Sequence, residues 1–165
     1  MPRKSRREEP GAAHHGFPRG ANRAEIFRDD GDRQTFLVIL KGVIETYGWR
    51  LLAYCLMRNH FHVVVETPLP NFGRGMQRLL STYAAYYNRR YDRPGHVFNR
   101  PFKSERIKDE HQLAVAVEYV ALNPVRAGLC TEPGDWRWSS HGTQTDVHRA
   151  AVLGAVGFEP TTSRV

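Results

Sequence analysis

Residues 60–65 read His-Phe-His-Val-Val-Val, and this run constrains the local fold more than any other part of the chain. Three consecutive β-branched residues favour a strand. Neighbouring side chains of a strand point to opposite faces, so we expect His60 and His62 to share one face and Phe61 to enter the layer on the other. Two imidazoles on one face can hold a divalent ion whose other ligands are oxygens. The alternative is a strand that carries two partly buried, hydrogen-bonded histidines.

A second pattern predicts a helix that begins after Asp109. This residue has the properties of an N-cap, and apolar residues then recur at helical spacing. Tyr119 and Asn123 are four residues apart and therefore lie on one face of the helix, in a row that Gln112 and Val115 continue. Tyrosine can act as a covalent nucleophile, and an asparagine oxygen can be a third ligand to a metal. The alternative for Tyr119 is a core residue with a satisfied hydroxyl.

The positive charge of the chain is concentrated in one segment. The 165 residues carry a formal net charge of +7, and residues 74–108 contain nine Lys or Arg against two acidic residues, which equals the excess of the whole chain. Aromatic residues are interleaved with these cations, so phosphate neutralisation and base stacking could share one surface. The alternative is a solvated helix face and loop. We predict that nucleic acid binds this segment, through Arg74, Arg78, Arg89, Arg90, Arg100, Lys103 and Arg106.

These motifs resemble the single-tyrosine HUH transposases of the insertion sequence 200 type, and within that group the REP-associated tyrosine transposases. The resemblance runs from about residue 11 to residue 141, and its strongest part is His-hydrophobic-His followed by a Tyr-x-x-x-Asn-Pro helix. Its matching segments are residues 53–68, 75–80, 83–90, 95–98, 102–103, 119–128 and 138–140.

The resemblance implies a metal-dependent single-strand DNA endonuclease and strand transferase that acts in DNA transposition. Tyr119 would attack a phosphodiester and keep the 5′ end as a phosphotyrosine. A divalent ion, Mg²⁺ or Mn²⁺, would be held by His60, His62 and Asn123. The implied partner is single-stranded or hairpin DNA, and the protein would be a monomer or a homodimer.

The expected fold class is α+β, a mostly antiparallel sheet with helices packed on it, of the ferredoxin-like HUH nuclease type. Apolar spacing predicts helices over residues 32–47 and 72–90, and strands over residues 51–57, 61–67 and 102–108. Pro124 is expected to stop the Tyr119 helix near its end. Residues 14–23 take the place of the family's first strand.

Several residues depart from the family pattern. Gly16 and Pro18 interrupt the expected first strand, where proline is tolerated only at edges or bulges. Arg58 and Pro101 replace a proline and an arginine. These departures keep open a second candidate, a catalytically degenerate derivative that acts only as a nucleic-acid-binding protein. An unrelated metalloenzyme that uses His-x-His is a third.

Domain boundaries follow from the extent of the resemblance. We expect a disordered basic N-terminus over residues 1–13, the catalytic domain over residues 14–141, and a C-terminal tail outside the family over residues 142–165. No secretory signal or membrane span is recognisable, so a cytoplasmic protein without a membrane partner is expected. Cys55 and Cys130 lack C-x-x-C spacing, which indicates neither a disulfide framework nor a zinc site.

Two smaller features have alternative interpretations. Glu66 shares the strand face of His60 and His62, and either orients these histidines or is a solvent-facing charge. Trp136 and Trp138 either anchor the last segment to the core, which we favour, or form a platform for base stacking.

Overall fold

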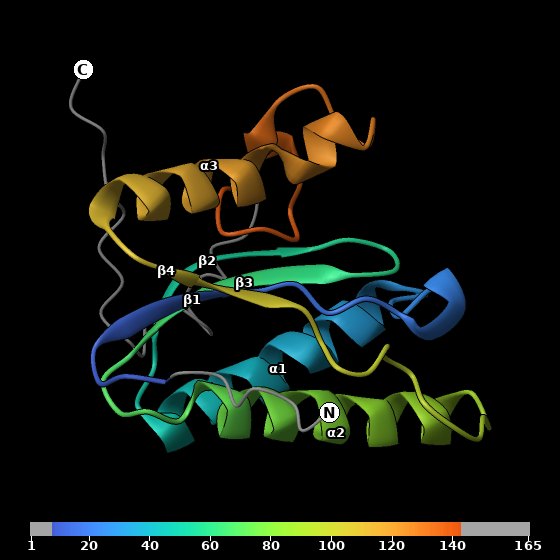
Figure 1. Cartoon of the computed structure of the whole chain (residues 1–165). Coiled ribbons are helices and arrows are strands. Elements are labelled where there is room, and N and C mark those ends of the chain that lie inside the picture. Colours follow the sequence, from blue (N-terminus) through green and yellow to red (C-terminus); the bar gives the residue numbers. More distant parts are fainter. Residues whose placement is uncertain (1–7, 143–165) are drawn as a thin grey trace.

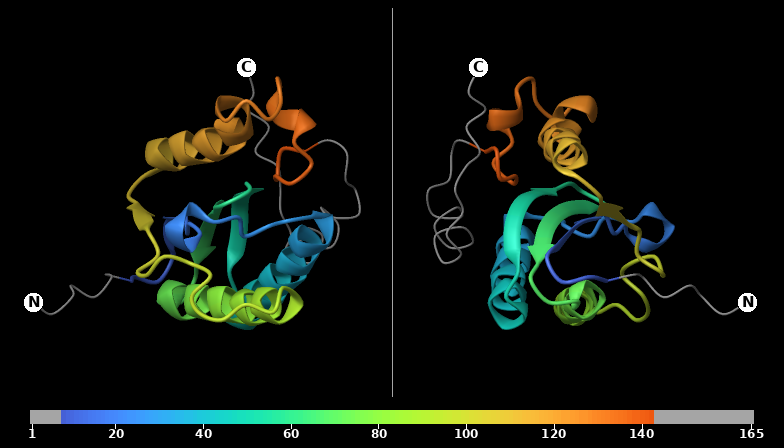
Figure 2. Two further views of the ribbon diagram at one scale, coloured as in Figure 1. Left: turned by 90° about the vertical axis from the view of Figure 1, so that its right-hand side faces the viewer. Right: turned by 60° about the vertical axis from the view of Figure 1, so that its left-hand side comes forward.

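The computed structural model describes residues 8–142. One sheet contains the strands β1 (Ala12–Gly16), β2 (Arg50–Leu56), β3 (Phe61–Thr67) and β4 (Ser104–Ile107) in the order β2-β3-β1-β4, with antiparallel pairing throughout. Helices α1 (Asp30–Tyr47) and α2 (Phe72–Arg90) cover one face, and α3 (Glu110–Arg126) covers the other (Figures 1 and 2). The short 3-10 helices are η1 (Ala21–Arg23) and η2 (Pro133–Asp135). The predicted α+β class is confirmed.

Strand β3 separates two hydrophobic layers, as the alternation of its sequence predicts. Phe61, Val63 and Val65 belong to the larger core with α1 and α2, where the Phe61 ring lies 4.6 Å from that of Phe36. Val64 belongs to the smaller core with Val120 of α3. Because His62 alternates with these residues in the same way as Val64, its imidazole lies on the α3 side of the sheet.

Local signals account for the ends of α1 and α3. The Asp29 carboxylate accepts the backbone N–H of Asp32 at the start of α1, and Gly48 ends that helix with a positive φ of 68°. Asp109 caps α3 in the same way by accepting the N–H of Gln112 at 2.8 Å, which confirms the predicted N-cap. Pro124 lies inside the last turn of α3 rather than ending it. A proline there removes one hydrogen bond near the helix end, a smaller disturbance than in the middle of a helix.

The first strand is more regular than its sequence predicts. Residues 14–16 belong to β1, but the strand begins at Ala12, so the segment expected to be disordered contributes two residues to the sheet. Pro18 lies beyond the strand, where its carbonyl accepts the N–H of Phe61. The proline therefore removes no donor from the ladder. The chain turns away into η1, in which Asn22 has a φ of 55°.

In the part of the chain that the structure describes, no helix is long and apolar enough to cross a membrane. Both cysteines are free thiols, as expected, and burial raises the pKa of Cys55 to about 12. The predicted tail after Gly142 lies outside the described residues.

Candidate active site

The two motifs that sequence analysis singled out meet between the sheet and α3. His60 precedes β3 and His62 lies in it, with ring centroids 5.1 Å apart. Tyr119 of α3 reaches over them, and its ring centroid lies 5.6 Å from that of His62. The two predicted faces, one on the strand and one on the helix, therefore lie next to each other in the folded chain.

Asn123, one turn along α3 from Tyr119, contacts the same group. Burial and the charge of Arg19 lower the pKa of the His60 imidazole, and a hydrogen bond with the Asn123 side chain partly opposes them. The Nδ1 atom of His60 lies 2.8 Å from Oδ1 of Asn59. When Nδ1 carries the proton, it donates to this amide oxygen and Nε2 of His60 keeps its lone pair.

Sequence analysis missed a third histidine at this site. Nε2 of His15 in β1 lies 2.9 Å from Nδ1 of His62, and the His15 ring centroid lies 6.1 Å from that of Tyr119. Burial lowers the pKa of His15 to about 4 and that of His62 to about 3. Both imidazoles are therefore neutral at neutral pH, which is the protonation state that ligates metals.

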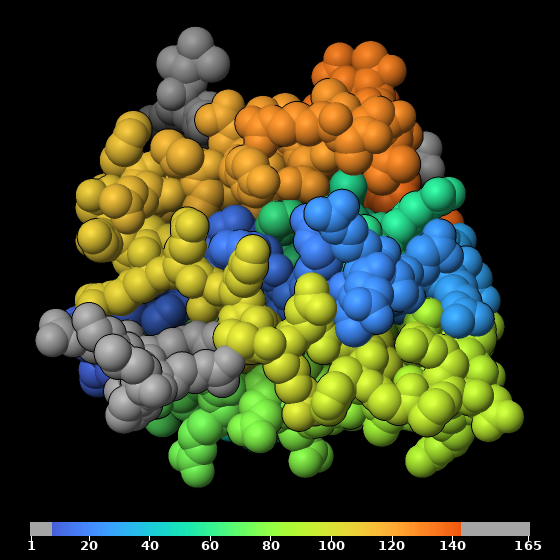
Figure 3. Space-filling model, turned by 45° about the vertical axis from the view of Figure 1, so that its right-hand side comes forward, coloured from blue at the N-terminus to red at the C-terminus, as the bar shows by residue number. Residues whose placement is uncertain are grey.

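Tyr119 opens into a cleft of about 620 Å³ between α3 and the β1–β4 edge of the sheet. The tyrosine is 43% exposed, and the guanidinium carbon of Arg126 lies 4.8 Å from the centre of its ring. Three members of the predicted helix row, Gln112, Val115 and Tyr119, line the cleft. In Figure 3 the blue N-terminal segment is visible between α3 above and the yellow segment before β4 below.

The donor set fits a divalent ion. Nε2 of His62 is buried and has no hydrogen-bond partner, and His60 presents a second nitrogen lone pair nearby. Within residues 8–142, no group of three His, Cys, Asp or Glu side chains could hold a metal. Two imidazoles and an amide oxygen are nevertheless ligands that divalent ions accept, with water or phosphate completing the coordination.

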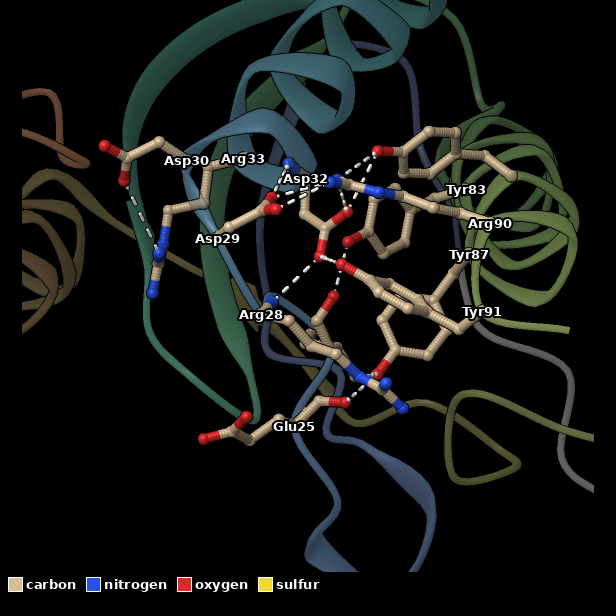
Figure 4. Close-up of polar contacts among 12 residues, drawn as sticks. Glu25, Arg28, Asp29, Asp30, Asp32, Arg33, Tyr83, Tyr87, Arg90 and Tyr91 are labelled. Atoms are coloured by element: carbon tan, nitrogen blue, oxygen red, sulfur yellow. Dashed lines mark hydrogen bonds and ion pairs between the residues drawn. The ribbon is translucent and has the colours of Figure 1, made fainter. Parts of the chain in front are cut away.

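The predicted nucleic-acid contacts fall into three groups. Arg90 at the end of α2, which the sequence pattern assigns to nucleic acid, already forms ion pairs within the protein. Its guanidinium binds the carboxylates of Asp29 and Asp32, both at 2.6 Å, and Tyr86 also donates to Asp32 (Figure 4). Asp32 is fully buried, so this network locks the end of α2 onto the start of α1.

The other predicted contacts lie on two different elements. Arg74, Arg78 and Arg89 are exposed on α2, across the sheet from Tyr119. Arg100 and Lys103 are exposed in the segment that leads into β4, and Arg106 of β4 lines the Tyr119 cleft while pairing with Glu9 at 2.7 Å. The charged segment of the sequence is therefore not one continuous surface.

Two features take the structural alternatives stated above. The Glu66 carboxylate pairs with Arg50 at 2.8 Å, and the partner of His62 is His15 instead. Trp138 is buried in the larger core, and the indole N–H of Trp136 donates to the carbonyl of Leu56 at 3.0 Å. Both tryptophans therefore anchor the segment after α3, while Trp136 remains partly exposed.

Comparison with known proteins places this arrangement in a family. Residues 14–123 match the sequence model of the family described as "Transposase IS200 like", a span that contains His60, His62, Tyr119 and Asn123. The chain belongs to the IS200-like transposase family. Within this family, it is 25% identical over 111 residues to a protein of Haemophilus influenzae Rd named as a REP-associated tyrosine transposase. The match covers 61% of this chain and 63% of that relative's length.

Two solved structures share the transposase fold. One, described as a REP-associated tyrosine transposase bound to a REP hairpin, superposes with a TM-score of 0.70 at 15% identity, over 100% of this chain and 95% of that one. The other, described as a transposase from Deinococcus radiodurans R1, has a TM-score of 0.51 at 18% identity, over 72% of this chain and 95% of that one.

Proposed function

We propose that this chain is a REP-associated tyrosine transposase that cleaves and rejoins single-stranded or hairpin DNA through a covalent phosphotyrosine at Tyr119. The observation that carries the proposal is the convergence of His60, His62 and Asn123 under an accessible tyrosine. The Tyr119 phenol is exposed next to buried imidazoles, and Nε2 of His62 has no hydrogen-bond partner. A catalytic role explains both features together, whereas a purely structural role for Tyr119 explains neither.

In the proposed reaction the phenol oxygen of Tyr119 forms a bond to the phosphorus of a phosphodiester. The bond from phosphorus to the 3′ oxygen breaks, and that oxygen leaves as a hydroxyl after taking up a proton. The 5′ phosphate stays on the tyrosine, so a second DNA hydroxyl can reverse the step and rejoin strands. A phenol does not ionise readily at neutral pH. The guanidinium carbon of Arg126 lies 4.8 Å from the ring centre and adds a positive charge beside the proposed nucleophile.

His60, His62 and Asn123 would hold a Mg²⁺ or Mn²⁺ ion. When bound, such an ion neutralises the non-bridging oxygens of the scissile phosphate and makes phosphorus easier to attack. Its binding through Nε2 of His62 requires the proton on Nδ1 of that ring, which then donates to Nε2 of His15. We therefore assign His15 as the residue that holds His62 in its ligating tautomer.

The proposal is tested by metal-dependent cleavage of single-stranded DNA. Tyr119→Phe keeps the ring and removes the nucleophilic oxygen, so cleavage should fall to background while the circular dichroism spectrum stays unchanged. Tyr47→Phe, on α1 across the sheet, is the matched control and should cleave like the parent protein. Equal cleavage by the parent and Tyr119→Phe would overturn the proposal.

The degenerate alternative predicts a different result in the same experiment. If the parent protein binds the strand but gives no cleavage with either Mg²⁺ or Mn²⁺, the chain is a nucleic-acid-binding derivative without chemistry.

A further inference from the structure

A second cleft, of about 460 Å³, lies between the start of α1, the turn from β2 to β3 and the chain that follows α3. It shares no lining residue with the cleft beside Tyr119. Its wall contains the side chains of Arg33, Arg58 and Arg137 together with the indoles of Trp136 and Trp138. Cations next to indoles are a combination that suits a nucleotide, because its phosphate and its base need different partners.

Arg33 lacks the partners that a buried cation requires. Its side chain is only 10% exposed, and its nearest carboxylate oxygen, on the exposed Asp30, lies 3.9 Å away (Figure 4). Its Nε is buried without a hydrogen-bond partner, and among the described residues its guanidinium makes no hydrogen bond at all. The guanidinium carbon instead lies 5.8 Å from the ring centres of both Trp136 and Trp138. Burial is unfavourable for a charge whose nearest partner is this distant, so an anion bound in the cleft would stabilise the Arg33 guanidinium.

The remaining groups of the cleft leave an excess of positive charge. Four arginines, of which Arg28 is the fourth, face the carboxylates of Glu25, Asp30 and Asp135. Asp30 is shared, since it also pairs with Arg137 at 3.5 Å. Arg58 is exposed and forms no ion pair within residues 8–142. Arg33 and Arg58 therefore have guanidinium donors available for a phosphate.

The position of the cleft relates it to the proposed active site. Arg58, which lines the cleft, belongs to the same turn as Asn59 and His60. The cleft is therefore next to His60, one of the proposed metal ligands. Trp136 is half-buried, and its hydrogen bond to the carbonyl of Leu56 fixes the plane of its ring. A fixed, partly exposed indole can stack an unpaired base.

We propose that this cleft binds one nucleotide of a single DNA strand beside the scissile position, with its phosphate on Arg33 and Arg58 and its base against Trp136. That the ligand is a DNA strand rests on the proposed function, whereas the cleft and its arginines are features of the structure. Guanidinium groups bind phosphate oxygens in a bidentate manner, which explains why arginines rather than lysines stand here.

The test measures binding without chemistry, using the full chain with Tyr119→Phe and a labelled single-stranded oligonucleotide of mixed sequence. Arg33→Met replaces a buried cation by an apolar side chain of similar size, so thermal stability should be unchanged or higher. Affinity should fall about tenfold, and the salt dependence of binding should flatten by about 0.7 per lost phosphate contact. Arg58→Gln, at an exposed position that does not threaten folding, should give the same loss. Lys41→Gln, on α1 outside the cleft, is the control.

Tryptophan fluorescence reports the base. The oligonucleotide should quench emission in the parent protein and much less in Trp136→Phe. Inorganic phosphate and a deoxynucleoside monophosphate serve as competitors: if the monophosphate displaces the strand from this cleft at micromolar concentration, the ligand is a free nucleotide and the assignment to the strand is overturned.

Unchanged affinity and salt dependence in both arginine variants would overturn the inference. If those variants bind normally while the parent protein forms its covalent adduct, the cleft is not a DNA site and the proposed function stands. If the arginines prove necessary for binding while no adduct forms, the cleft is confirmed and the proposed nucleophile is wrong.

Discussion

At the scale of single residues, His15 is the most informative position in the candidate site. Its contact with His62 at 2.9 Å joins two buried, neutral imidazoles, so one ring must donate and the other accept. The sequence could not reveal this pair. The pairing of β1 with β3 joins segments far apart in the chain, and the register that sets His15 beside His62 is not visible in either segment alone.

We predict that His15 raises the metal affinity of the site because its Nε2 accepts a hydrogen bond from Nδ1 of His62. His15→Leu removes the acceptor, and Mn²⁺ should bind about 10–100-fold more weakly, as is usual when the hydrogen-bond partner of a ligating histidine is lost. His15→Gln keeps an acceptor oxygen and should restore most of the affinity. Calorimetric titration with Mn²⁺ measures both variants, and nitrogen NMR shows the tautomer of His62. Equal affinity of the leucine variant and the parent would remove His15 from the site.

Arg90 is a second residue whose contacts depend on segments far apart in the sequence. Its place in a basic run predicts a phosphate contact, whereas the structure binds it to Asp29 and Asp32. Those carboxylates lie 61 and 58 residues earlier in the sequence, so no local pattern separates Arg90 from its neighbour Arg89.

At the scale of helices and strands, local sequence signals predict most of the elements. The alternation of residues 61–67 gave β3 its two faces, and Asp29 and Asp109 cap α1 and α3 through their own carboxylates. The exception is β1, where Gly16 and Pro18 suggested an irregular strand. Gly16 fits because its missing side chain leaves room for Met76 and Phe72, whose atoms would lie 3.2 and 3.3 Å from an added Cβ. That close packing of helix on sheet is a tertiary property.

Two helical glycines should respond to alanine with opposite signs. A Cβ at Gly75 in α2 would collide with the buried ring of Trp49, so Gly75→Ala should destabilise the protein by about 1–3 kcal/mol through overpacking. Gly42 in α1 is exposed and has open space around it, so Gly42→Ala should stabilise by about 0.5–1 kcal/mol through helix propensity. Urea unfolding measures both. A stabilised Gly75→Ala variant would contradict the packing of α2 against Trp49.

At the scale of the whole molecule, the basic residues fall on two elements at different distances from the Tyr119 cleft. Arg100 and Lys103 lie on the segment that leads into β4, which lines that cleft, whereas Arg74 and Arg78 lie on α2, on the face of the sheet opposite α3. The sequence placed all four in one basic segment, because a linear pattern carries no information on which face of a sheet each helix covers.

This separation predicts unequal contributions to DNA binding. Removing the charges of Arg100 and Lys103 together should lower the salt slope of single-strand binding by about 1.4, since each phosphate contact to a single strand contributes about 0.7. The matched pair Arg74→Gln and Arg78→Gln should change it much less. Fluorescence anisotropy over a range of salt concentrations measures both pairs. A larger effect of the α2 pair would place the DNA across the opposite face of the sheet.

The central claim is that Tyr119 is the nucleophile, and identification of the residue that becomes attached to DNA tests it most directly. The parent protein is incubated with a cleavable single strand and Mn²⁺, denatured and digested, and the peptide that carries the nucleotide is sequenced by mass spectrometry. We predict a single adduct on the α3 peptide at Tyr119, absent without metal and absent in Tyr119→Phe. An adduct on Tyr83, Tyr86 or Tyr87 of α2, or one that persists in Tyr119→Phe, would contradict the account.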